Sequence, residues 1–285
     1  MESTASLLHI GAALNQGRDA LASNTSARLD AELLLAHVLR CPRSTLLRDS
    51  ERALGSAAQT QYFALIARRA QGEPLAYLTG EREFWSLPLR VTPAVLIPRP
   101  ETELVVERAL ALLGTETARV ADLGTGSGAI ALALARERPQ WLITATDRSA
   151  AALEVAAQNA QALGLGAVRF LHGDWCGPLA GECFDLIASN PPYIAEGDSA
   201  LLDAALQHEP QQALVSGPRG LTALCQIIRE ARSHLQPGGY LVLEHGSDQA
   251  AAVSAALVDA GYANVRSHRD LAGHERVSEA RAAGL

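Results

Sequence analysis

Four consecutive residues, Asn190-Pro191-Pro192-Tyr193, carry the groups that could activate a planar nitrogen. Such a nitrogen is a poor nucleophile because its lone pair is delocalised. The Asn190 side-chain oxygen and the Pro191 carbonyl could each accept one N–H of an NH2 group, which would concentrate electron density on the nitrogen and orient it. Proline fixes the backbone there, and Tyr193 could pack on the flat face of the target group. The run therefore favours methylation of a planar nitrogen by positioning and electrostatics, and we predict catalytic and substrate-binding roles for Asn190, Pro191, Pro192 and Tyr193.

A glycine-rich corner lies earlier in the chain. An apolar run ends at Asp122-Leu123, and a helical pattern begins at Ala129, so that five residues form the turn: Gly124, Thr125, Gly126, Ser127 and Gly128. Glycines at a strand-to-helix turn let the backbone approach a ligand closely. Nicotinamide and flavin enzymes use a related element, but the acidic Asp122 before the glycines favours S-adenosylmethionine.

Further residues extend this candidate cofactor site. Asp147 ends the next apolar run, 20 to 25 residues on, where a carboxylate could accept hydrogen bonds from both ribose hydroxyls. The alternative is that Asp147 caps the helix that begins near Ser149. Trp175 follows the third run and could wall off an adenine ring, with Asp174 near the adenine amino group. A partly buried core tryptophan is the other reading.

Helical stretches alternate with short apolar runs from Leu104 onward. The runs are Arg119 to Leu123, Leu142 to Asp147, Val168 to His172, Phe184 to Ser189 and Tyr240 to Glu244. This alternation predicts βαβ units and a parallel sheet covered on both faces, whose carboxyl-end edge would gather the candidate residues. Gly164, Gly238-Gly239 and Gly261 are expected to cap helix C-termini.

The N-terminal part has a different texture. From about Ser3 to Gln71, leucines and other apolar residues recur at helical spacing, which predicts a small helical bundle. Short β-like runs with several prolines follow, around Phe84-Trp85 and Leu89 to Val91, and indicate a linker that forms a hairpin.

Composition removes several classes of function. All 24 basic residues are arginine, so chemistry that needs a lysine Schiff base or a phosphate-loop lysine is excluded. The four cysteines have no metal-ligand spacing, so we expect free thiols and no metal site. A net charge of -7 disfavours nonspecific nucleic-acid binding, and no membrane-spanning stretch or leader pattern occurs, so we expect a cytoplasmic protein.

Segments along nearly the whole chain match one family pattern. They are Gly72-Glu73-Pro74-Leu75-Ala76-Tyr77, Phe84-Trp85, Ile97-Pro98-Arg99-Pro100-Glu101-Thr102-Glu103, the glycine loop, the Asn-Pro-Pro-Tyr run and Leu243-Glu244-His245-Gly246. On these segments the chain resembles the protein-(glutamine-N5) methyltransferases that modify peptide chain release factors, the PrmC or HemK family. The Asn-Pro-Pro-Tyr run alone is shared with DNA adenine and RNA guanine methyltransferases.

The resemblance implies an α/β fold: a Rossmann-like class I methyltransferase with a doubly wound, mostly parallel sheet. It implies a release-factor-docking bundle over residues 1–80, a hairpin linker over 81–100 and a catalytic domain over 101–285. The substrate would be the glutamine of the release factor Gly-Gly-Gln loop, and the product N5-methylglutamine. Cofactor contacts would fall on Gly124 to Gly128, Asp147, Trp175 and Asn190. We expect a monomer without direct nucleic-acid contact.

Three charged residues have open roles. Arg99 and Glu101 could form a pocket wall, or they could make ordinary linker salt bridges. His245 follows a buried run and is expected to be structural. Gln207-His208 stand where the family pattern has an aromatic residue before Glu209-Pro210, so substrate contacts are not carried over to the loop 195–208. The remaining alternatives are methylation of an exocyclic amine in nucleic acid, or a binding module without activity.

Overall fold

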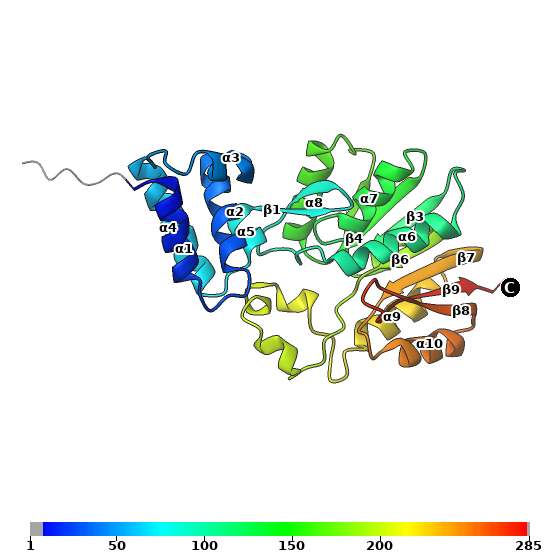
Figure 1. Cartoon of the computed structure of the whole chain (residues 1–285). Helices are drawn as coiled ribbons and strands as arrows, with labels where there is room; N and C mark the ends of the chain where they lie inside the picture. The colour runs from blue at the N-terminus through cyan, green and yellow to red at the C-terminus, as the bar shows by residue number, and fades with distance from the viewer. Residues whose placement is uncertain (1–7, 284–285) are drawn as a thin grey trace, which may run out of the picture. The chain divides into compact units, whose positions relative to one another are not determined.

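The computed structural model describes residues 8–283, which divide into two compact units that meet in sequence between Gly80 and Glu81 (Figure 1). The expected start of the bundle near Ser3 lies outside the described residues. Within residues 8–283, no helix is both long and apolar enough to cross a membrane.

The first unit is helical. Its helices in the described range are α1 Ile10–Ala20, α2 Ala27–Leu39, α3 Arg43–Arg48, α4 Ser56–Ala70 and α5 Leu75–Thr79. Apolar residues at helical spacing on α1, α2 and α4 form one buried cluster that includes Leu34, Leu35 and Tyr62. Asp30 is also buried there, and its carboxylate accepts a hydrogen bond from Arg69 Nε at 2.7 Å. The predicted bundle is thus present in residues 8–80.

Close packing at Gly17 gives a stability prediction. A Cβ atom at Gly17 in α1 would lie 2.0 Å from the Tyr62 hydroxyl oxygen, and Tyr62 is fully buried. We expect Gly17→Ala to destabilise the first unit by about 1–3 kcal/mol, because overpacking outweighs the higher helix propensity of alanine. Thermal unfolding measures this. Gly11→Ala in the same helix is the control, since its Cβ would meet nothing closer than 3.4 Å, and an equal loss in both variants would contradict the packing argument.

The second unit begins with a hairpin. Strands β1 Glu81–Phe84 and β2 Leu87–Arg90 pair antiparallel, as expected. Both loop residues, Trp85 and Ser86, have positive φ, as a tight two-residue hairpin turn requires. Trp85 tolerates this because its backbone N–H donates to Glu103 and its indole N–H to Glu137, each at 2.8 Å. The inward side chains of the hairpin join the core of the second unit.

The main sheet has seven strands among the described residues. They are β3 Arg119–Leu123, β4 Leu142–Asp147, β5 Arg169–His172, β6 Phe184–Ser189, β7 Leu235–Glu244, β8 Tyr262–Arg269 and β9 Glu275–Ala282. Their order is β5-β4-β3-β6-β7-β9-β8, and β9 alone runs antiparallel to the other six strands. The predicted doubly wound, mostly parallel sheet is confirmed, with two strands at the C-terminal end that the sequence pattern did not indicate.

Helices cover both faces of this sheet (Figure 1). One face carries α6 Glu103–Leu112, α7 Ala129–Glu137 and α8 Ala150–Ala162, and the other carries α9 Thr222–Ala231 and α10 Ala250–Asp259. Strand residues alternate between the two cores, as the pleat dictates. Val242 of β7, for example, faces α6 and α7, whereas Leu241 and Leu243 face α9 and α10.

Two of the expected glycine caps are present and one is wrong. Gly164 and Gly261 have positive φ and follow the C-terminal residues of α8 and α10. Gly238-Gly239 instead lie within β7. A Cβ at Gly239 would come within 3.1 Å of the backbone oxygens of Phe184 and Asp185, so glycine serves close approach to β6, where the strand register shifts.

The strand order reverses between β3 and β6, which lie side by side at the centre of the sheet. Connections from these two strands lead in opposite directions, so their carboxyl ends leave a crevice, the usual ligand position in open α/β sheets. The glycine loop follows β3, and Asn190 follows β6. The fold therefore brings the two halves of the candidate site to one edge.

Candidate active site

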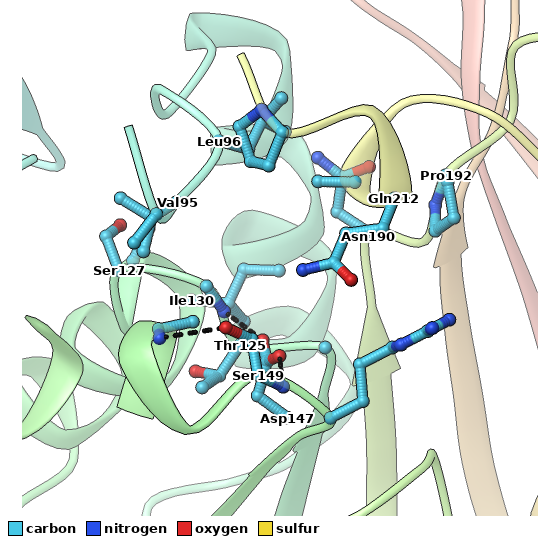
Figure 2. Close-up of a pocket in the computed structure, with 18 of the residues that line it drawn as sticks. Val95, Leu96, Thr125, Ser127, Ile130, Asp147, Ser149, Asn190, Pro192 and Gln212 are labelled. Carbon is cyan, nitrogen blue, oxygen red and sulfur yellow. Dashed lines mark hydrogen bonds between the residues drawn. The ribbon is translucent and has the colours of Figure 1, made fainter. Parts of the chain in front are cut away.

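A pocket of about 860 Å³, which includes its open mouth, lies at this edge (Figure 2). In Figure 2, Asn190 and Pro192 lie on one side of the pocket and Asp147, Thr125 and Ser149 on the other. Its lining comes from the ends of four strands and from two segments outside them. The lining residues are Ala94, Val95, Leu96, Pro98, Thr102, Gly124, Thr125, Gly126, Ser127, Ala129, Ile130, Asp147, Arg148, Ser149, Ala152, Asp174, Trp175, Asn190, Pro192, Pro210, Gln212 and Ala213.

The glycine loop is held to the neighbouring strand β4. The backbone N–H groups of Gly124 and Thr125 both donate to the Thr146 carbonyl, at 2.9 and 3.0 Å. A Cβ at Gly126 would meet no atom within 4 Å, whereas a Cβ at Gly128 would lie 3.0 Å from the Leu132 side chain. Gly126 thus leaves backbone exposed to a ligand, and Gly128 permits close packing of α7. Of the five predicted loop residues, only Gly128 is absent from the lining.

The side chain of Asp122 holds the glycine loop in place by hydrogen bonds. The residue is fully buried, and its Oδ2 accepts hydrogen bonds from the Thr125 hydroxyl at 2.6 Å and from the Ala131 N–H at 3.2 Å. Burial raises the pKa of Asp122 to about 7. The carboxyl therefore connects the loop to the first turn of α7.

Asp147 has both oxygens fixed by backbone donors. Oδ2 accepts from Gly126 N–H at 2.9 Å and Oδ1 from Ser149 N–H at 2.8 Å, while burial raises the pKa of the carboxyl. The N-cap of α8 is Ser149, whose hydroxyl accepts from Ala152 N–H. Asp147 is therefore not the helix cap. Each of its oxygens keeps a lone pair for a ligand hydroxyl in the pocket.

Trp175 forms a wall beside the glycine loop. A Cβ at Gly124 would lie 3.0 Å from Cζ3 of the Trp175 ring, so the indole packs directly over that glycine. Trp175 has φ of 40°, and its carbonyl accepts from the Thr146 hydroxyl at 2.9 Å, which holds this backbone turn in place. The side chain also packs partly against the core, so Trp175 is both a pocket-wall residue and a partly buried core residue.

Asn190 presents an open acceptor at the pocket. Its side-chain Nδ2 donates to the Thr102 hydroxyl at 3.0 Å. No hydrogen bond from residues 8–283 reaches Asn190 Oδ1 or the Pro191 carbonyl. Pro191 is buried and Pro192 lines the pocket. The two acceptors that the sequence analysis singled out are thus both available.

Tyr193 makes its hydrogen bonds with the protein. It is half-buried and, like Pro191, it is not among the described residues that line the pocket. Its hydroxyl donates to Glu244 Oε1 at 3.4 Å, and its carbonyl accepts from the Gln249 side chain at 2.9 Å. Burial raises the pKa of the Tyr193 hydroxyl. Packing of its ring on a substrate stays a prediction.

The segment before α6 does line the pocket, but with other residues than Arg99 and Glu101. Thr102 and four residues of 94–98 line the pocket, and neither Arg99 nor Glu101 does so in the described structure. Arg99 instead pairs with the buried Glu209, whose Oε2 also accepts from Ile97 N–H at 3.0 Å. Glu209 therefore ties this segment to the residues that follow it.

Pro210, Gln212 and Ala213, just beyond Glu209, complete the pocket wall. Their residue types and spacing in the sequence do not predict ligand contacts. The Glu209-Pro210 pair was the only available signal. No residue of the loop 195–208 lines the pocket within the described structure.

His245 is structural in its surroundings, as expected. It is fully buried, its Nδ1 donates to the Gly246 carbonyl at 2.9 Å and its Nε2 accepts from the Ser278 hydroxyl at 2.9 Å. Burial lowers the pKa of this histidine, which favours the neutral ring. All four cysteines are free thiols, of which Cys176 is buried.

Comparisons with known proteins agree with this architecture. Residues 12–80 match the family model described as the PrmC N-terminal domain, and residues 115–278 match a methyltransferase domain. A solved methyltransferase from Pyrococcus furiosus, 20% identical, superposes with a TM-score of 0.54 over 81% of this chain and 100% of that chain. The chain is therefore a methyltransferase of the class I fold, as its sheet order, its pocket and its match to a methyltransferase domain indicate.

Curated relatives narrow the class. The release factor glutamine methyltransferase of Xylella fastidiosa strain Temecula1 is 52% identical over 267 residues, which cover 93% of this chain and 97% of that protein. The enzyme of the same name from Salmonella typhimurium is 49% identical and covers 93% of this chain and 95% of its own length. This chain belongs to the release factor glutamine methyltransferase family.

Proposed function

We propose that the protein transfers a methyl group from S-adenosylmethionine to the side-chain amide nitrogen, N5, of the glutamine in the Gly-Gly-Gln motif of peptide chain release factors. The products are N5-methylglutamine and S-adenosylhomocysteine. One observation carries the proposal: in a member of this family, Asn190 Oδ1 and the Pro191 carbonyl are open acceptors beside the pocket that the glycine loop and Asp147 line. These are the partners that the two N–H groups of a primary amide need.

The pocket fits the cofactor that this reaction needs. We assign cofactor contacts to Gly124, Thr125, Gly126, Ser127, Gly128, Asp147, Trp175 and Asn190. Asp147 would accept the ribose hydroxyls with the lone pairs that its backbone donors leave free. The exposed backbone at Gly126 and the Trp175 ring would border the rest of the nucleoside. The cofactor supplies a sulfonium methyl group, which an in-line nucleophile can displace.

The protein's part in the reaction is to orient and polarise the amide. Asn190 and Pro191 hold the NH2 group in line with the methyl carbon. Because the reacting groups are then already oriented, less entropy is lost on reaching the transition state. Attack by the oriented nitrogen would form the nitrogen–carbon bond and leave the electron pair of the broken carbon–sulfur bond on sulfur. The methylated nitrogen then loses a proton to solvent, which restores a neutral amide. We assign substrate contact to all four residues Asn190 to Tyr193.

We further propose how the rest of the chain serves this reaction. Residues 1–80 dock the release factor, residues 81–100 connect and also contribute Ala94, Val95, Leu96 and Pro98 to the pocket, and residues 101–285 carry the catalytic machinery. The match of residues 12–80 to a family model of their own supports a dedicated role. The partner is a release factor rather than nucleic acid, in keeping with a net charge of -7. We place the reaction in the cytoplasm, where release factors act on ribosomes, with the enzyme as a monomer.

A labelling experiment tests the proposal. The protein is incubated with methyl-labelled S-adenosylmethionine and, separately, with release factor, a Gln→Ala variant of its Gly-Gly-Gln motif, DNA and RNA. We expect label on the release factor, and none on the variant. Label on DNA or RNA without label on the release factor would replace the proposal with methylation of an exocyclic amine. In that case, binding of the protein to DNA or RNA would also depend strongly on the salt concentration.

A further inference from the structure

The run from Asn190 to Tyr193 is tied to the strands on both sides of it. It follows β6, which lies between β3 and β7 in the sheet. On the β3 side, the Ser189 hydroxyl donates to the Leu123 carbonyl at 2.6 Å, just before the run. On the β7 side, Nε2 of Gln249 donates to the Tyr193 carbonyl at 2.9 Å. Gln249 lies at the start of α10, in the segment that follows β7.

The run between these two ties is stiff. The proline rings fix φ at Pro191 and Pro192. Asn190 and Pro191 each precede a proline, which restricts their own backbones to extended conformations. Few torsions are therefore left to absorb a shift at one end, and a displacement at Tyr193 is passed on to the Pro191 carbonyl and to Asn190.

The orientation of the Gln249 amide is set by backbone groups. Its Oε1 accepts from the Gly246 N–H at 2.9 Å, and its Nε2 also lies 3.4 Å from the Arg219 carbonyl as a donor. A backbone N–H can only donate and a carbonyl can only accept. The amide oxygen must therefore face Gly246, and the NH2 group must face the Tyr193 carbonyl.

The peptide group between Tyr193 and Ile194 is held on both of its sides. Its carbonyl accepts from Gln249, and its N–H donates to the Leu214 carbonyl at 2.9 Å. Gly220 packs against the same carbonyl: a Cβ there would collide with the Tyr193 oxygen and lie 2.8 Å from Gln249 Nε2. Gly220 thus leaves the space in which this hydrogen bond forms.

We propose that Gln249 is a positioning residue for methyl transfer. By holding the Tyr193 carbonyl, it sets where the Pro191 carbonyl and Asn190 meet the substrate amide. Gln249 is not among the described residues that line the pocket, so it acts through the run rather than on the cofactor. The inference rests on the proposed function for the acceptor roles of Asn190 and Pro191, whereas the tie itself concerns this chain alone.

Removing the Gln249 amide is the first test. We expect Gln249→Met, which keeps the length of the side chain, to lower kcat about tenfold with little change in the KM for S-adenosylmethionine. Gln249→Glu should be impaired at least as strongly, because a carboxylate oxygen would then face the Tyr193 carbonyl. Gln226→Met is the matched control and should keep the wild-type kcat, since the half-buried Gln226 donates instead to Glu230 of its own helix at 2.8 Å. Wild-type kcat in both Gln249 variants would overturn the inference.

A methyl group at Gly220 tests the same tie from the other side. Gly220→Ala should lower kcat by about tenfold or more, because the new Cβ displaces the Tyr193 carbonyl. The control is Gly164→Ala, which introduces the same left-handed strain: φ is 70° at Gly164 and 69° at Gly220, and a Cβ at Gly164 would meet no atom within 4 Å. Thermal unfolding shows that both variants are folded at the assay temperature. Equal kcat values in the two variants would speak against positioning through Tyr193.

NMR of the enzyme without substrate observes the tie directly. Tyr193-Ile194 is the one Tyr–Ile pair in the chain, so ¹³C-carbonyl tyrosine and ¹⁵N isoleucine together give a single carbonyl–nitrogen cross-peak. We expect this peak to shift in Gln249→Met and Gly220→Ala and to stay in place in Gln226→Met and Gly164→Ala. An unmoved peak in the first two variants would refute the tie even in an active methyltransferase. A shifted peak in a protein whose wild type fails to label release factor would refute the proposed function and leave the tie standing.

Discussion

Asn190→Ala is expected to lower kcat for methyl transfer by about a hundred- to a thousandfold, which is the effect of removing one preorganised polar contact to the reacting group. The amide nitrogen of the substrate would then keep its lone pair delocalised and its NH2 group unoriented. Because Asn190 is half-buried and its side chain makes only one hydrogen bond within the described structure, the fold should tolerate the change. Single-turnover labelling of release factor measures the rate, and thermal unfolding checks the fold.

A second variant at the same position tests whether placement matters. Asn190→Gln keeps the amide group but moves it by one methylene, away from both Thr102 and the substrate. We expect this variant to be impaired nearly as strongly, because a displacement of about 1 Å can cost about a hundredfold in rate. If Asn190→Ala kept more than a tenth of the wild-type rate, Asn190 would not be the acceptor that activates the nitrogen.

The part of the site that could be predicted from the sequence consists of residues that directly follow the strands. The glycine loop and Asp147 each directly follow an apolar run, and the carboxyl ends of parallel strands meet at one edge. Asn190 follows β6 in the same way. Knowing that the sheet was parallel was therefore enough to bring these residues together before any contact was known.

Contacts between segments that are distant in sequence could not be predicted from these local patterns. Thr102 and Asn190 are 88 residues apart in sequence, and Ile97 and Glu209 are 112 apart. Both pairs depend on how the segment before α6 passes over the sheet edge, which no periodic pattern specifies. For the same reason, Arg99 was a plausible wall residue from its charge, whereas its guanidinium is engaged by Glu209.

Strands β8 and β9 were missed because their polar residues hide the usual pattern. β9 lies between β7 and β8 and buries Ser278 and Glu279 beside Val277 and Ala280. The buried Glu279 is tolerated because it pairs with Arg108 at 2.9 Å, a residue of α6 far away in sequence. An apolar run is therefore not what marks an inner strand here.

Asp147→Ala is expected to raise the KM for S-adenosylmethionine about a hundredfold, because two charge-assisted hydrogen bonds to ribose hydroxyls contribute about 1.5–3 kcal/mol each and part of this is recovered by solvent. The loss falls on binding that is equal in the ground and transition states. At saturating cofactor, kcat should therefore change little. Isothermal titration with S-adenosylhomocysteine gives the affinity without turnover.

The control for this prediction is Asp185→Ala. Asp185 is also a strand carboxylate that accepts a backbone N–H, from Arg119 at 2.8 Å, but it lies at the opposite end of the sheet from the pocket. If Asp147→Ala and Asp185→Ala weakened cofactor binding equally, the effect of Asp147 would be a general disturbance of the sheet. A selective loss with Asp147→Ala would instead tie cofactor affinity to the one carboxylate that the fold fixes with two backbone donors and leaves open to the pocket.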